Sequence, residues 1–122
     1  MAHTLKELIA AFEQSNGSDQ VYLIQSALEL ARDKPWISEA VFRKAVECLE
    51  AGGSLDAALS LVPEGCFWYV GAGKTREDEP LFGTMVQEAK FDGVELGIAE
   101  TDVSAALALC LAALKARAAK EK

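Results

Sequence analysis

The first part of the chain repeats apolar side chains at the spacing of amphipathic helices. Leu5, Leu8, Ile9 and Phe12 follow an i, i+3, i+4, i+7 pattern, which places four apolar side chains on one face of a helix. The same kind of stripe recurs twice before the first pair of consecutive glycines. The pattern therefore predicts three helices, over about residues 4–14, 18–32 and 38–52.

Residues that favour helix ends stand at the edges of these stripes. Thr4 opens a Thr-x-x-Glu capping box, Ser18 is the expected N-cap of the second helix, and Ser38 or Ile37 opens the third. The pair Gly52-Gly53 supplies a C-terminal cap, because glycine readily adopts the left-handed conformation found there. These residues define where each helix is expected to begin or end.

The periodicity changes after the glycine pair. We expect an N-terminal segment of three helices over 1–53 and an α-β-β-β-α unit over 54–122, which together form one compact domain. In the second unit the pattern predicts a short helix at 54–62, strands at 66–70, 83–91 and 94–98, an Asp92-Gly93 hairpin turn, and a last helix over 102–118 capped by Thr101. The stretch from Gly71 to Pro80 is expected to be the longest loop.

The last helix is apolar on every side, so it must be covered on two sides. We expect the sheet on one of its faces and the N-terminal helices on the other, and a second copy of the chain is the alternative cover. The expected fold class is α+β: N-terminal helices followed by a helix, a three-stranded antiparallel meander and a long C-terminal helix, in α/β/α-like layers.

Composition describes one soluble domain, with 51% hydrophobic residues, 25% charged residues and a net charge of −7. This charge makes nucleic acid an unlikely partner, because nucleic acid is bound chiefly by Lys and Arg. The longest apolar stretch, Val103 to Leu114, is shorter than the roughly 20 residues that span a bilayer. We therefore expect no membrane partner.

Candidate chemistry is sparse. Cys48, Cys66 and Cys110 are far apart in the sequence, and no secretory leader stands at the start, so three reduced thiols in the cytoplasm are expected. His3 is the only histidine, which leaves no Cys-His or Ser-His pair. The run Gly71 to Thr75 ends in Gly-Lys-Thr but lacks the spacing of a phosphate-binding loop. We expect no catalytic, metal-binding or cofactor-binding residues and no cofactor; a small-molecule ligand is unknown.

Aromatic and leucine side chains provide the candidate interaction surface. Strand alternation places Trp68 and Tyr69 on opposite faces of one strand, and Trp and Tyr are favoured at interfaces. The alternative is that both faces are covered within the fold. On the apolar last helix, Leu107 and Leu111 complete the candidate surface.

A family resemblance covers about residues 54–118. The phrase Ala57 to Gly65, the aromatic strand after it and the closing run Ala106 to Ala116 together resemble small uncharacterised proteins of tailed phages and prophages, some of them classed as a phage α/β/α sandwich domain. In that family the residue directly after the glycine is Trp, whereas here it is Cys66. The resemblance implies a phage-like genomic setting and no activity.

The function expected from the sequence is that of a non-enzymatic phage- or prophage-type protein. It would act through contacts with a protein partner or by self-association as a homodimer. The alternative is a nucleic-acid-associated regulator or an acidic DNA-mimic decoy, and an enzyme using paired carboxylates is a third candidate.

Overall fold

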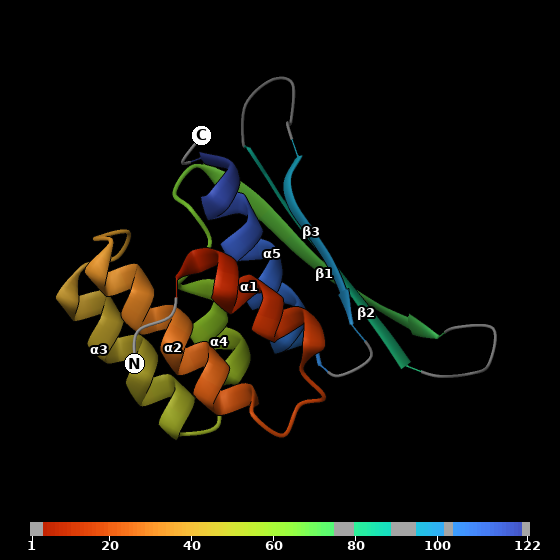
Figure 1. Cartoon of the computed structure of the whole chain (residues 1–122), viewed down its shortest axis with the longest axis horizontal. Coiled ribbons are helices and arrows are strands. Elements are labelled where there is room, and N and C mark those ends of the chain that lie inside the picture. Colours follow the sequence, from red (N-terminus) through yellow and green to blue (C-terminus); the bar gives the residue numbers. More distant parts are fainter. Residues whose placement is uncertain (1–3, 75–79, 89–94, 102–103, 121–122) are drawn as a thin grey trace.

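The computed structural model describes residues 4–74, 80–88, 95–101 and 104–120. Four helices are followed by three strands and a fifth helix (Figure 1). The elements are α1 (Leu5–Gln14), α2 (Gln20–Asp33), α3 (Glu39–Glu50), α4 (Ser54–Leu59), β1 (Cys66–Lys74), β2 (Pro80–Glu88), β3 (Glu95–Thr101) and α5 (Ala105–Lys120).

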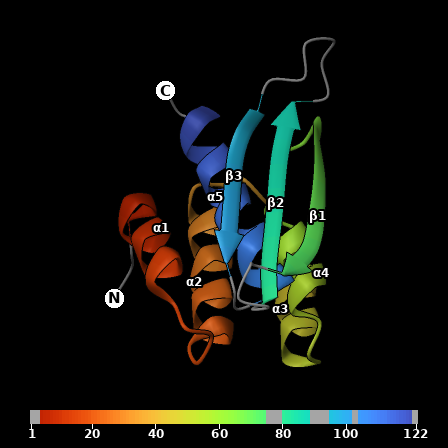
Figure 2. The same cartoon turned by 90° about the vertical axis from the view of Figure 1, so that its right-hand side faces the viewer.

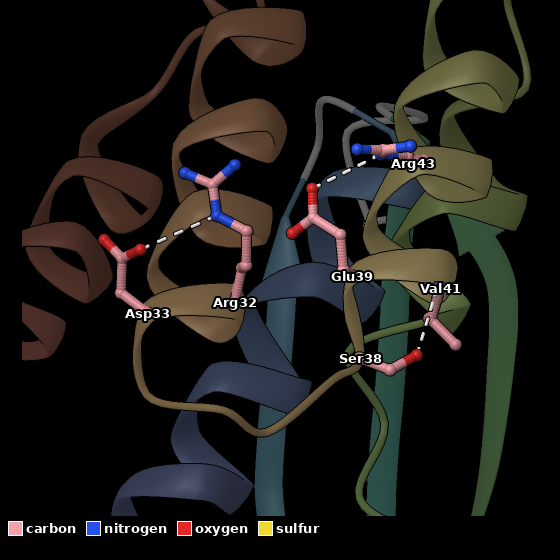
Figure 3. Close-up of polar contacts among 6 residues, drawn as sticks. All are labelled: Arg32, Asp33, Ser38, Glu39, Val41 and Arg43. Carbon is pink, nitrogen blue, oxygen red and sulfur yellow. Dashed lines mark hydrogen bonds and ion pairs between the residues drawn. The ribbon is translucent and has the colours of Figure 1, made fainter.

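Two of the expected N-caps are confirmed. At the start of α1, the Thr4 hydroxyl accepts from the Glu7 amide at 3.1 Å, and the Glu7 carboxylate accepts from the Thr4 amide at 3.0 Å. At the start of α3, the Ser38 hydroxyl accepts from the Val41 amide at 3.2 Å (Figure 3). Each bond satisfies an amide that has no partner within its own helix.

Two other caps differ from expectation. Asp19, not Ser18, is the N-cap of α2, and it makes no side-chain cap bond. The Ser18 hydroxyl instead donates to the Asn16 carboxamide oxygen at 2.8 Å, so a local turn takes the group that would have capped the helix. The last helix also begins later than expected, because Ser104 rather than Thr101 accepts from the Leu107 amide at 3.1 Å.

The glycine pair after α3 ends that helix as predicted. Gly52 has φ of +92°, a conformation that side chains other than glycine rarely adopt. The Gly53 amide then donates to the Cys48 carbonyl at 2.7 Å, and a Cβ on Gly53 would lie 3.1 Å from that oxygen. Glycine is thus required at the first position by conformation and is favoured at the second by space.

The three strands form one antiparallel sheet in the order β1-β2-β3. The β1–β2 register runs without interruption from Cys66↔Glu88 to Lys74↔Pro80. The expected long loop is therefore wrong at Gly71 to Lys74, which belong to β1, and at Pro80, which begins β2. Residues 75–79 of that loop lie outside the described residues. The Asp92-Gly93 turn lies outside the described residues.

The expected fold class, α+β with α/β/α-like layers, is wrong. Helices make up most of the regular structure, and all five lie on the same side of the strands (Figures 1 and 2). The sheet is thus an outer layer of a mainly helical protein. The physical reason is that α5 has to be covered twice, and packing the other helices around it leaves none for the far face of the sheet.

Helix α5 occupies the centre of the molecule. Ten of its residues are buried, with α1, α2 and α4 on one side and the strands on the other. One hydrophobic core therefore includes residues from both 1–53 and 54–122. Because the chain itself covers α5, this helix no longer argues for a second copy as its cover.

Candidate interaction surface

The structure buries the two leucines of the candidate interaction surface. Leu107 is 0% exposed and Leu111 is 3% exposed, because both point from α5 into the core. This part of the expected surface is therefore corrected. The sequence pattern identified α5 as a helix covered on two sides, but it could not show that both covers belong to the same chain.

Trp68 remains a surface residue, with 44% of its area exposed. It pairs with Val86, which is fully buried beneath the helices, and its neighbours Cys66 and Val70 pack against the same core. Trp68 thus lies on the helix-facing side of the sheet, and its exposure follows from its place in the edge strand β1. The side chain of Tyr69 lies outside the part of the structure that is described.

The opposite side of the sheet, which we call the outer face, carries no described helix (Figure 2). Gly71 follows Val70 in β1 and therefore occupies the outer face by alternation. Gly71 is exposed, and a Cβ built on it would meet no atom within 4 Å. The structure therefore shows open space above the outer face at this position.

A second feature, not predicted from the sequence, joins three distant segments around Arg117. Its guanidinium lies 5.2 Å from the centre of the Trp36 ring, and its Nε donates to the Leu61 carbonyl at 3.1 Å. Burial lowers the pKa of Arg117, while the nearby Cys66 and Glu64 act in the opposite direction. These two contacts link α5 to the α2–α3 connection and to the end of α4. We interpret them as a structural contact that stabilises the fold, and we call the contacts of Arg117 with Trp36 and Leu61 the clasp.

No local sequence signal indicates the Arg117–Trp36 contact. Arg117 reads as a basic residue in the last turn of a helix, where it complements the helix dipole. Trp36 follows Pro35 in a short connection, which marks a helix end and nothing more. The pair becomes visible only when the chain is folded.

Charged side chains on α2 and α3 form local ion pairs. The Arg43 Nε lies 3.3 Å from the Glu39 carboxylate, and on α2 the Arg32 Nε lies 3.6 Å from Asp33 (Figure 3). The open hollow beside Arg43 is lined by one helix alone, by Glu39, Ala40, Arg43, Lys44 and Glu47. Exposed ion pairs of this kind contribute little to stability. The two pairs do not form a shared binding site.

The cysteines occupy separate places. Cys48 and Cys66 are half-buried, Cys110 is buried in α5, and all three are free thiols. Burial raises the pKa of the Cys110 thiol, which keeps it protonated and unreactive. Within the described ranges, no three His, Cys, Asp or Glu residues are grouped so that they could hold a metal ion.

Comparison with known proteins gives no relative for this chain. No protein-family model matches it, and neither does any curated protein or solved structure. Among the described helices, none is both long enough and apolar enough to cross a bilayer. Arguments about function therefore rest on the geometry of the chain itself.

Proposed function

We propose that this chain is a non-enzymatic, phage- or prophage-type protein that acts through protein–protein contacts made by the outer face of its sheet. The observation that carries the proposal is the placement of all five helices on one side of the strands (Figures 1 and 2). A sheet in a soluble domain is ordinarily either covered by another layer or polar on its open side.

The exposed Gly71 supports a contact surface on this face. A Cβ built on it would meet no atom within 4 Å. A glycine in a strand leaves room for another backbone or a large side chain to approach closely. The phage-type setting is supported by the resemblance of residues 54–118.

The experiment is a quantitative co-purification from cells that express the chain from its own gene. It compares the natural protein with Gly71→Lys, which places a charged side chain in the open space above the outer face, and Val21→Lys serves as a control on the exposed surface of α2. We expect a defined set of proteins to be lost with Gly71→Lys, retained with Val21→Lys and bound again when purified separately. Equal recovery with both variants would refute the outer face as the contact surface.

A further inference from the structure

We infer that the free edge of β1 binds an extended, positively charged peptide segment of a partner protein, which pairs with β1 as a further strand of the sheet. In this mode of recognition, main-chain hydrogen bonds hold the added strand on an exposed sheet edge. The inference goes beyond the proposed function, because it uses the backbone of an edge strand and not the outer face of the sheet.

One side of the β1 backbone is unpaired in the sheet. The described sheet pairs β1 with β2 alone, so the other side of β1 presents amides and carbonyls that no strand of this sheet meets. The strand is nine residues long, from Cys66 to Lys74, and its register with β2 is unbroken. Proteins usually shorten, bulge, charge or cover such an edge, because it otherwise templates pairing with another chain. β1 is neither short nor bulged.

The residues of β1 also lack the chemical forms of protection. Between Cys66 and Gly73 the sequence contains no charged residue and no proline. Trp68 is exposed on the helix-facing side of the strand, and Gly71 is exposed on the outer face. Both sides of the strand are therefore accessible beside its edge, and Trp68 offers an apolar cross-strand contact to an incoming strand.

The opposite edge of the sheet, β3, differs in each of these respects. β3 has seven residues, and its register with β2 shifts between Val86 and Gln87, which leaves Leu96 without a paired residue. Two of its seven residues, Glu95 and Glu100, are acidic. Helix α5 packs chiefly against β3 and β2 and least against β1. A short, bulged and charged strand beside a helix is a poor template, so we assign the added strand to β1.

Charge determines which kind of strand fits this edge. The chain carries 19 acidic and 12 basic residues, and the part that contains the sheet, residues 54–101, holds nine of the acidic and three of the basic ones. An acidic protein attracts a basic segment during encounter and repels an acidic one. The partner segment is therefore expected to be rich in Lys or Arg, and the same charge opposes pairing between two copies of this chain.

A peptide selection on the full chain tests the kind of partner. The library displays random peptides of about ten residues, which span β1 at about 3.3 Å per residue. We expect the enriched peptides to alternate β-branched or aromatic residues with polar ones, to carry a net positive charge and to lack proline at their centre. Enrichment of acidic peptides or of peptides with helical periodicity would overturn the inference, and so would a selection that enriches no peptide.

Backbone methylation of the most enriched peptide tests pairing through the edge. Successive residues of a strand direct their amides to opposite sides, so one alternate set of amides faces β1 and the other faces away. In titration calorimetry, N-methylation of one set should weaken binding at least about tenfold, and N-methylation of the other should leave it within about threefold. Equal effects of the two sets would contradict edge pairing, whereas a peptide held on the outer face by its side chains would give them.

Variants of the chain locate the bound peptide. Trp68→Lys places a charge beside the edge of β1, which is a device by which natural edge strands avoid pairing, and it should weaken binding at least about tenfold. Tyr22→Lys makes the same kind of change on the exposed surface of α2 and should leave binding within about threefold. Urea unfolding shows whether each variant is folded.

Hydrogen exchange of the natural protein gives a readout that needs no variant. Amides of β1 should exchange more slowly when the selected peptide is bound, because they gain hydrogen-bond partners. Protection of β3 or of the helices instead of β1 would overturn the inference, and so would a folded Trp68→Lys variant that binds as tightly as the natural protein.

Discussion

The central place of α5 predicts that Leu109→Ala is strongly destabilising. Leu109 is fully buried within α5, and that helix is enclosed by helices on one side and by strands on the other. Removing a buried leucine side chain costs about 2–5 kcal/mol, and the cost is higher where the neighbours cannot collapse into the cavity. Because two layers hold this cavity open, we expect about 3–4 kcal/mol.

This loss is a large part of the total for a domain of 122 residues, for which about 6–18 kcal/mol is typical. Urea unfolding followed by far-UV circular dichroism measures it, and the melting temperature should fall by about 10–15 °C. Leu55→Ala is the matched control, because the same change on the exposed surface of α4 should cost less than about 1 kcal/mol. A Leu109→Ala loss no larger than the control's would refute the double cover of α5.

Three further changes test other contacts. Ser104→Ala should cost about 1 kcal/mol in urea unfolding, because α5 loses the acceptor of its N-cap. Arg117→Gln should cost about 1–2 kcal/mol and shift the Trp36 fluorescence, whereas Arg43→Gln, which breaks an exposed pair, should cost less than about 0.5 kcal/mol; equal losses would refute the clasp. Burial raises the pKa of Cys110 above its ordinary value of 9.0, so the unfolded chain loses this proton first and stability should fall by up to about 1.4 kcal/mol per pH unit as the pH rises above 9. Urea titrations at several pH values should show a smaller fall in Cys110→Ala, and identical pH profiles would contradict the burial of this thiol.

Helices were predicted well where the determining interactions are local. The capping box at Thr4 and the cap at Ser38 join residues three apart, so the sequence displays both partners together. Ser18 does not cap α2, because its hydroxyl bonds to the Asn16 side chain and Asp19 takes the N-cap position. A polar side chain near a helix start can bond either to the helix amides or to a neighbouring turn, and spacing alone does not decide between these two bonds.

The layers and the interaction surface could not be predicted in the same way. Which element covers which face depends on contacts between distant segments, such as the one between Arg117 and Trp36. Leu107 and Leu111 were assigned to a surface because their helix is apolar all round, and that pattern is the same whether the cover is internal or a second chain. The strand ends at Gly71 and Pro80 were misplaced because glycine and proline mark loops, although paired strands tolerate both near their ends.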